Sequence, residues 1–452
     1  MTDTTDKADK VKQRPVGPRS RKIFAQESRH MAPGLQSFAL YSGLAMARGH
    51  GSRLYDEDGN AYIDFIAGIA VGSVGHCHPH YVARLKEQLE RLTFGSFTTE
   101  VRARFLELLA SVAPPGLTRI QLFSGGAEAV EAAFRLAKSA TKKHEFVGYT
   151  GAFHGKTGGV LPLLWGDFKT GLGPFAPGCY SAPYAYCYRC PLSLTYPDCG
   201  IACAEKTRDL IRNQTGGAIA AVIVEPMQGT AGNVIAPPGF LPAIQSIARE
   251  HGALLIADEM ITGFGRTGKM WGVDHDGVVP DIMTVGKGVG GGFPLSGLLS
   301  TDALTSQPPF SNPSGSSSSY GGNPLASAAG LASLEIITRE NLVQNSEKVG
   351  RAMLGKLLAM KEKHAVIGDV RGKGLLLGLE LVKDRGTKEL VSKDRTKALF
   401  QECLRRGLVA MSYSPVIRIN PPLNIDEPTA MEGLDILDEA LTAVFARGEG
   451  EA

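Results

Sequence analysis

Three short apolar runs constrain the fold of this chain more than any other feature of its sequence. They read VIVEP, LLIADE and IMTVGK, at residues 222–226, 254–259 and 282–287. Each run is too short for a helix and is bounded by Gly, Pro or Asp, which is typical of strands buried on both faces of a parallel sheet. Helical patterns alternate with such runs at residues 80–93, 127–143, 239–251 and 325–339. The alternation predicts an α/β fold with a large, mostly parallel sheet.

Length sets the expected domain organisation. The chain has 452 residues, of which 43% are hydrophobic, and single cores stop growing near ~250–300 residues. We expect a disordered arm at residues 1–22, an N-terminal segment at 23–78 that joins the small domain, a large domain at 79–330 and a C-terminal small α+β domain at 331–452. The turn dipeptide Asp58-Gly59 predicts a hairpin within residues 52–76.

Charge and composition exclude several classes of protein. Lys and Arg number 48 against 45 Asp and Glu, so binding of nucleic acid through bulk charge is excluded. No stretch approaches the ~18 consecutive apolar residues of a membrane-spanning helix. The first 22 residues lack the apolar core of a signal peptide. The seven cysteines are therefore expected to be reduced thiols, and we predict a cytoplasmic protein without a membrane partner.

Two glycine motifs fail the tests for nucleotide binding. Residues 263–269 match GxxxxGK, but Met270 follows where a P-loop needs Ser or Thr. The second motif, GxGxxG, is formed by Gly286, Gly288 and Gly291. A strand pattern follows it, whereas a dinucleotide site needs a helix N-terminus.

Cysteine and histidine clusters raise the question of a metal. Four cysteines form CxxC-x8-CxxxC, namely Cys187, Cys190, Cys199 and Cys203. Structural thiols, a zinc site and an oxidised pair are the alternatives, and the short internal spacing favours structural thiols. The HCHPH segment at residues 76–80 lacks a nearby carboxylate partner. We expect its histidines to have structural or site-lining roles, and we predict no metal.

The strongest chemical signal is an aspartate and a lysine at the ends of two apolar runs. Asp258 ends one run, and Lys287 ends the next, 29 residues later. Carboxyl ends of parallel strands form the ligand-binding edge of such sheets. Burial lowers the pKa of a lysine and makes it a Schiff-base nucleophile, while a nearby aspartate can hold a protonated ring nitrogen. Pyridoxal 5'-phosphate (PLP) needs this pair; the alternative is a buried structural ion pair.

The segments ADEMITGFGRTGK and GKGVGGGFPLSG resemble the class III PLP-dependent aminotransferases. The resemblance covers nearly the whole chain, from LYDEDGNAYIDF through the C-terminal domain. It implies a fold type I (aspartate aminotransferase superfamily) PLP-dependent transferase, with a large domain around a mostly parallel sheet and a smaller α+β domain. Lys287 is then expected to be the Schiff-base lysine that also moves the substrate proton, and Asp258 the partner of the pyridine nitrogen.

The resemblance also implies further cofactor-binding residues. The turn in FSGGAEAVEAA resembles the one that binds the phosphate before a helix that starts near Glu128; its residues are Gly125, Gly126 and Ala127. Phe153 is expected to stack on the cofactor ring, with a core aromatic as the alternative. Ser319 stands where the family has a Thr that reaches the phosphate from the neighbouring subunit, which implies a homodimer with shared active sites. Glu225 is expected near the cofactor or in a structural hydrogen bond.

Departures from the family pattern bear on the substrate. Arg418 in VIRINPP resembles the arginine that binds the substrate carboxylate, with a structural surface arginine as the alternative. Ornithine- and γ-aminobutyrate-type members have a Glu at the position of Thr230, which gates that arginine, and a Gln at the position of Ile261. Thr230 and Ile261 therefore favour an amine:pyruvate-type enzyme. Tyr41 lies in a loop that is expected to line the substrate pocket.

The segment at residues 185–203 is similar to inserts in amino-acid racemases and in aminotransferases of aminoglycoside assembly. It indicates a larger amine or an aminosugar as substrate. Taken together, the resemblance implies an aminotransferase that moves an amino group from an amino donor to a carbonyl acceptor by a ping-pong mechanism. An epimerase or racemase on the same scaffold and an acetylornithine/ornithine-type aminotransferase are the alternatives.

Overall fold

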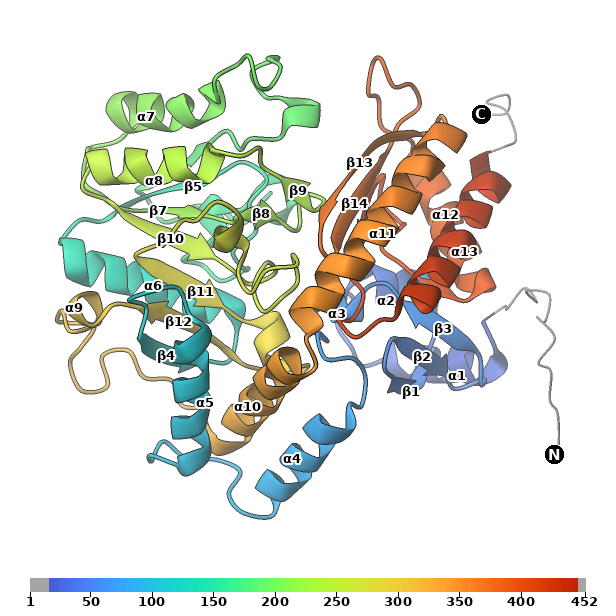
Figure 1. Ribbon diagram of the computed structural model, residues 1–452, viewed down its shortest axis with the longest axis horizontal. Helices are drawn as coiled ribbons and strands as arrows, with labels where there is room; N and C mark the ends of the chain where they lie inside the picture. Colours follow the sequence, from blue (N-terminus) through green and yellow to red (C-terminus); the bar gives the residue numbers. More distant parts are fainter. Residues whose placement is uncertain (1–15, 446–452) are drawn as a thin grey trace.

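The computed structural model describes residues 16–445. Residues 1–15, where a disordered arm is predicted, and residues 446–452 lie outside the described residues. Figure 1 shows two parts: a larger one around a central sheet, and a smaller one that contains both ends of the described chain. The long helices α10 (Pro324–Arg339) and α11 (Leu342–Lys363) follow one another from the larger part into the smaller.

The larger part is built on a seven-stranded sheet. Its strands, in spatial order, are β4 (Arg119–Phe123), β12 (Ser296–Ser300), β11 (Ile282–Val285), β10 (Leu254–Asp258), β7 (Ile219–Val224), β5 (Glu145–Tyr149) and β6 (Cys179–Ala182). All neighbouring pairs are parallel except those of β12, which runs antiparallel to β11 and β4. The expected mostly parallel α/β sheet is confirmed.

Helices cover both faces of this sheet. On β7, Val222 and Val224 pack into the core that includes α8, while Ala221 and Ile223 pack into the core that includes α6. Successive side chains of a strand point to opposite faces, so a strand covered on both sides has to be apolar throughout. This explains the continuous apolar runs. The covering helices are α6 (Gly126–Thr141), α7 (Ala202–Gln214) and α8 (Phe240–Glu250).

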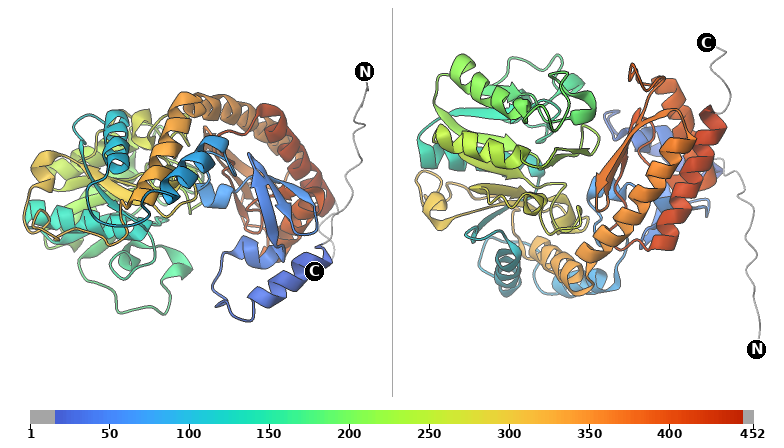
Figure 2. Two further views of the ribbon diagram at one scale, coloured as in Figure 1. Left: turned by 90° about the horizontal axis from the view of Figure 1, so that it is seen from below. Right: turned by 45° about the horizontal axis from the view of Figure 1, so that its top comes forward.

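The smaller part joins the two ends of the chain. An antiparallel sheet contains β13 (Ile367–Lys373), β14 (Leu376–Leu381) and β16 (Val416–Ile419). A second sheet contains β1 (Met46–His50), β2 (Arg53–Asp56), β3 (Ala61–Asp64) and β15 (Leu408–Val409). β3 pairs in parallel with β15, which ties the N-terminal segment to the C-terminal one. Helices α11, α12 (Lys393–Arg406) and α13 (Glu427–Phe445) pack together beside these sheets (Figure 2).

The remaining elements are α2 (Ser37–Ser42), α3 (Ala67–Ala70), α4 (Pro79–Leu89), α5 (Glu100–Val112), α9 (Asp302–Thr305), β8 (Met227–Gln228) and β9 (Val234–Ile235). Helices α4 and α5 pack against α10. Over residues 16–445, no helix is both long and apolar enough to cross a membrane.

Several expected boundaries shift in the structure. Helices α6, α8 and α10 lie within two residues of their predicted ranges, but the helix predicted at residues 80–93 ends at Leu89. The hairpin is formed by β2 and β3 and ends at Asp64 rather than near residue 76. The predicted domain boundary between residues 330 and 331 falls inside α10, which continues through it, so the boundary stays a prediction.

The prediction of disorder up to residue 22 is wrong for residues 18–22, which begin helix α1 (Pro18–Glu27). The Asp58 carboxylate accepts hydrogen bonds from the backbone N–H groups of Arg19 and Ser20, both at 2.9 Å. These groups have no partner within the helix itself, so an acceptor there stabilises the helix start. The acceptor lies 38 residues away in sequence, which is why the local polar pattern did not indicate a helix.

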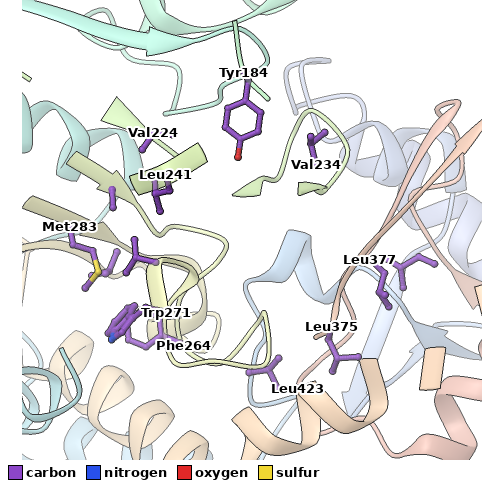
Figure 3. Close-up of a cluster of buried hydrophobic side chains, with 14 of the residues drawn as sticks. Tyr184, Val224, Val234, Leu241, Phe264, Trp271, Met283, Leu375, Leu377 and Leu423 are labelled. Carbon is purple, nitrogen blue, oxygen red and sulfur yellow. The ribbon is translucent and has the colours of Figure 1, made fainter. Parts of the chain in front are cut away.

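The hydrophobic core continues from the large sheet into the smaller part. Figure 3 shows Phe264 and Trp271 side by side, with Met283 of β11 on one side and Leu375 and Leu423 on the other. The two rings meet edge to face, with centroids 4.8 Å apart. Both lie in the segment that leaves the carboxyl end of β10 at Asp258, so their packing anchors this segment in the core.

We expect Asp58→Ala to release α1, because the substitution removes the acceptor of two backbone N–H groups. Limited proteolysis should then cut within residues 18–27 faster than in the wild-type protein. The control is Glu57→Gln, which loses only the side-chain pair with Arg19 and should be cut at the wild-type rate. Equal protection of Asp58→Ala and wild type would contradict the role of Asp58.

Candidate active site

A cavity of about 340 Å³ lies at the carboxyl edge of the large sheet. Its lining includes Lys287, Phe153, His154 and Met260, together with the first turn of α6. Asp258 is the last residue of β10, as expected. Lys287 lies two residues beyond the end of β11, where it begins the short 3-10 helix η5 (Lys287–Gly290). The sheet edge therefore brings together groups that are distant in sequence.

The Lys287 amine has the properties of a nucleophile. Burial lowers its pKa and the charge of Arg418 lowers it further, against the opposing charges of Asp258 and Glu225. Within residues 16–445, no carboxylate forms an ion pair with this amine, so the alternative of a structural Lys–Asp pair is not formed. The backbone of Lys287 has φ 45°, in the left-handed region that non-glycine residues seldom adopt. Such strain persists where the surrounding structure requires it, often at functional sites.

Asp258 is hydrogen-bonded to a histidine that was not predicted from the sequence as a site residue. The His154 Nδ1 atom lies 2.6 Å from one Asp258 carboxylate oxygen, and both side chains are buried. The other oxygen accepts a hydrogen bond from the Met260 backbone N–H at 3.1 Å. Burial disfavours charge on His154, but the hydrogen bond and charge of Asp258 outweigh it, so the pKa of His154 is raised. The only signal in the sequence was a histidine directly after Phe153 in GAFHGKT.

Glu225 links two backbone segments of the site. It directly follows β7, and its oxygens accept hydrogen bonds from the N–H groups of Phe153, at 2.8 Å, and Gly229, at 3.0 Å. Burial raises its pKa, and the Asp258 charge adds to this effect, while His154 opposes it. The structure therefore places Glu225 in a structural hydrogen-bonding role beside the cavity, where it fixes the backbone of Phe153.

The start of α6 fits a phosphate. The helix begins at Gly126, with Gly125 as its N-cap, rather than near Glu128 as expected. Its first N–H groups have no partner within the helix, and a helix N-terminus favours anions. Close backbone approach is required here, because a Cβ on Gly155 would lie 2.3 Å from the Cβ of Ala127. Gly155 also has φ 111°, which excludes most side chains.

The chain that leads to Val71, another residue of the cavity lining, is strained. Residues 67–70 all have positive φ, at 46°, 62°, 67° and 58°. Each non-glycine residue in this left-handed conformation costs about 1–2 kcal/mol. This turn, which leads to the edge of the cavity, was not predicted from the sequence.

The other site candidates lie outside the cavity lining. Ile261 is buried against Ala70, Met227 and Leu376. Thr230 lies in the turn between β8 and β9. Ser319 is exposed, and the structure does not bring it to Lys287 within one chain.

Arg418 and Tyr41 lie on the small-part side of the site. Arg418 is a half-buried residue of β16 whose charge acts on Lys287. Tyr41 is exposed on α2, and its ring meets that of Tyr413 edge to face at 5.7 Å. The substrate-binding roles of Arg418 and Tyr41 therefore stay predictions.

The histidine and cysteine clusters have other environments. The expectation that the HCHPH histidines lack carboxylate partners is wrong: His76 pairs with Asp64 at 2.8 Å and His80 with Glu335 at 2.7 Å. Asp64 lies 12 residues before His76, and Glu335 lies 255 residues after His80. The four clustered cysteines are free thiols. In the described part of the chain, no group of three or more His, Cys, Asp or Glu side chains is arranged to hold a metal ion.

Residues 39–441 match the family model described as "Aminotransferase class-III". The chain belongs to the class III aminotransferase family. The match spans most of the chain and includes each element of the cavity. The expected fold type I architecture, aminotransferase class and dependence on PLP are thereby confirmed.

Relatives across the family are similar over nearly their full length. The leucine/methionine racemase of Thermococcus litoralis is 35% identical, covering 94% of this chain and 95% of the racemase. The acetylornithine aminotransferase of Methanopyrus kandleri is 37% identical, covering 88% of this chain and 95% of that enzyme. An amine transaminase from an uncultivated Pseudomonas species, described as PLP-bound, has a TM-score of 0.84 at 29% identity, covering 93% and 98% of the two chains.

The residues of the cavity fit the cofactor of the family. The α6 N-terminus suits its phosphate, Asp258 its ring nitrogen, the Phe153 side chain its ring face, and the Lys287 amine its aldehyde. When bound, PLP supplies an electron sink for the carbon that bears the amino group. The His154–Asp258 hydrogen bond fixes the orientation of the Asp258 carboxylate.

The raised pKa of His154 predicts a pH-dependent contribution to stability. A histidine whose folded-state pKa is raised contributes stability that is present below its unfolded pKa, near ~6.5, and is lost as pH rises through the folded value. We therefore expect His154→Gln to lower the melting temperature of the holoenzyme more at pH 6 than at pH 9. The control is His275→Gln: burial lowers the pKa of His275 to about 4, so this substitution should lower the melting temperature less at pH 6 than at pH 9, the opposite of His154→Gln. A His154→Gln effect that is constant across this pH range would contradict the assignment.

Proposed function

We propose that this aminotransferase moves an amino group between a carboxylate-bearing amino acid and a carbonyl acceptor, with Lys287 as its catalytic base. The observation that carries the proposal is that two opposite charges act on the Lys287 amine. One is the charge of Asp258, which is hydrogen-bonded to His154, and the other is the half-buried cation of Arg418. Such a cavity suits a substrate with one reacting amino group and one carboxylate.

Each residue has a distinct role in the proposal. Lys287, with its lowered pKa, takes the proton from the substrate carbon that bears the nitrogen. It then returns the proton to the carbon on the other side of that nitrogen. Asp258, oriented by His154, keeps the ring nitrogen protonated. Arg418 binds the substrate carboxylate, for which a guanidinium offers paired N–H donors.

Thr230 and Ile261 support an amine:pyruvate-type specificity within this proposal. Neither residue can supply the acid or the amide expected at these positions in ornithine-type members. The similarity to an acetylornithine aminotransferase favours ornithine-type specificity instead. The three relatives described above are named for amino acids or amines, which gives an aminosugar substrate no added support. Ornithine and an aminosugar therefore both belong in the donor panel.

A racemase is the second candidate, because a leucine/methionine racemase is 35% identical over 94% of this chain. A racemase would return the proton to the same carbon, without net transfer of the amino group. Incubation of L-leucine in deuterated water without a carbonyl acceptor separates the two functions. D-leucine with deuterium at the α-carbon would establish the racemase.

We further propose a homodimer, in which Ser319 of the partner subunit completes the phosphate site. Ser319 lies beside Tyr320, whose side chain is 73% exposed, and Phe94 and Phe97 are 77% and 88% exposed. The two loops are neighbours, since Arg102 donates hydrogen bonds to the carbonyls of both Ser96 and Gly322, at 3.5 Å each. Exposed aromatic side chains gathered on one face are typical of an interface core.

The seven free cysteines support our proposal of a reducing, cytoplasmic location.

We expect Lys287→Ala to bind the cofactor without a covalent bond and to lose activity by at least roughly 10²–10⁴-fold, the usual contribution of a proton-transfer group. The assay uses glutamate, alanine, ornithine, a simple amine and an aminosugar as donors. Lys156→Ala is the matched control, because this lysine lies 5.9 Å from the Phe153 ring but outside the cavity lining. Turnover retained by Lys287→Ala would refute the role of Lys287.

The proposed dimer is tested by Phe97→Asp. A charge in an apolar interface is costly to bury, so sedimentation should show monomers and cofactor affinity should fall. Ser319→Ala should weaken cofactor retention while the dimer persists. Leu358→Asp, on exposed α11, serves as the control and should remain dimeric. A wild-type protein that sediments as a monomer would contradict the proposal.

A further inference from the structure

A second cavity, of about 280 Å³, lies where the large and small parts of the molecule meet. Three segments line it: the chain that follows β10, at residues 267–275, helix α11, and the turn between β13 and β14. It shares no lining residue with the Lys287 cavity. Its volume is close to that of pockets for small ligands, which begin near ~300 Å³.

Close backbone contacts hold the three segments together. A Cβ atom on Gly374, in the β13–β14 turn, would lie 2.4 Å from the backbone nitrogen of Gly268, and one on Gly350 of α11 would lie 2.0 Å from the Gly374 carbonyl oxygen. The Leu375 N–H also donates a hydrogen bond to the Arg266 carbonyl at 3.0 Å. The cavity is therefore preformed, and a ligand in it would contact both parts of the molecule.

Basic side chains dominate the charge of this cavity. Lys269, Lys373 and Arg351 line it, and Glu347 is the acid among the lining residues. In the part of the chain that the structure describes, neither lysine forms an ion pair. Lys269 donates a hydrogen bond to the backbone carbonyl of Asp274 at 3.0 Å. Arg351 and Glu347 form an exposed pair along α11, at 2.6 Å, and such pairs contribute little to stability.

His275 shows how positive this cavity is. Its Nε2 atom lies 3.0 Å from the Thr267 hydroxyl and 3.2 Å from the Thr267 carbonyl oxygen. Because a carbonyl oxygen only accepts, Nε2 carries the proton, and Nδ1 faces the Lys373 amine at 3.4 Å. Burial and the charges of Lys373 and Lys269 lower the pKa of His275 to about 4, while Glu347 opposes them. The ring is therefore neutral beside two amines that have no counter-charge.

Two ammonium groups beside a preformed cavity favour an anion with two charges. Like charges that are held together disfavour each other's charged state, and an anion between them removes that cost. A phosphate group carries close to two negative charges at neutral pH and presents several strong acceptor oxygens. A guanidinium binds it through paired hydrogen bonds and an ammonium as a point charge, and the lining offers both kinds of group.

We propose that this cavity is a second ligand site, which binds the phosphate dianion, either as inorganic phosphate or as part of a small phosphate monoester. Lys269 binds the phosphate oxygens from the large part of the molecule, and Lys373 and Arg351 bind them from the small part. The bound anion joins the two parts. This inference does not depend on the proposed function, since no residue of the Lys287 cavity contributes to the site.

The first test titrates inorganic phosphate and glycerol 3-phosphate calorimetrically into the holoenzyme at pH 8. In this form the cofactor already occupies its own phosphate site. At least one probe should bind, and more tightly than acetate, an anion with one charge; glycerol should not bind. The tighter of the two probes shows whether free phosphate or a monoester is the ligand. If neither probe binds, or if acetate binds as tightly, the proposal is overturned.

Two substitutions and a matched control locate the binding. Lys269→Gln and Lys373→Gln should each weaken binding of the tighter probe roughly ten-fold, the usual effect of losing a hydrogen bond to a charged group. The control is Lys348→Gln, which also removes a positive charge, from an exposed residue of α11 outside the cavity lining. It should bind the probe as wild type does. Wild-type affinity in both Lys269→Gln and Lys373→Gln would overturn the proposal.

The absorption of the bound cofactor separates this site from the Lys287 cavity. The probe should leave that absorption unchanged while it raises the melting temperature, because a ligand that binds only the folded state stabilises it. The rise should be smaller in Lys373→Gln than in wild type at the same probe concentration. A change in cofactor absorption that saturates together with the calorimetric binding would place the anion in the Lys287 cavity and overturn the proposal.

Discussion

The hydrogen bond between His154 and Asp258 is the interaction on which the rest of the site depends. A carboxylate buried at the end of a parallel strand would be protonated or displaced if it had no partner. At 2.6 Å, the imidazole of His154 supplies both a hydrogen bond and charge. The charge of Asp258 in turn acts on the pKa of Lys287.

The fold supports this pair from several directions. The core that includes Phe264 and Trp271 fixes the chain after Asp258, and Glu225 fixes the backbone of Phe153, the residue before His154. The left-handed conformations at residues 67–70 and at Lys287 store strain next to the cavity. Such conformations persist where the surrounding packing holds them in place. Since helices cover both faces of the sheet, the cavity lies at its carboxyl edge.

The parts of this architecture that depend on local pattern could be predicted from the sequence. The continuous apolar runs identified β7, β10 and β11, because strands covered on both faces need apolar side chains throughout. Helix α1 could not be predicted, since its cap is Asp58, from a distant turn. The role of His154 was equally hidden, since its partner lies 104 residues away. Arg418 was found only through family resemblance.

The lysine that carries the cofactor can be located directly on the chain. Holoenzyme is reduced with borohydride and digested, and mass spectrometry identifies the lysine that carries the pyridoxyl group. We predict that Lys287 alone is modified. A pyridoxyl group on another lysine, such as Lys156, or on none, would contradict the assignment of this cavity as the active site.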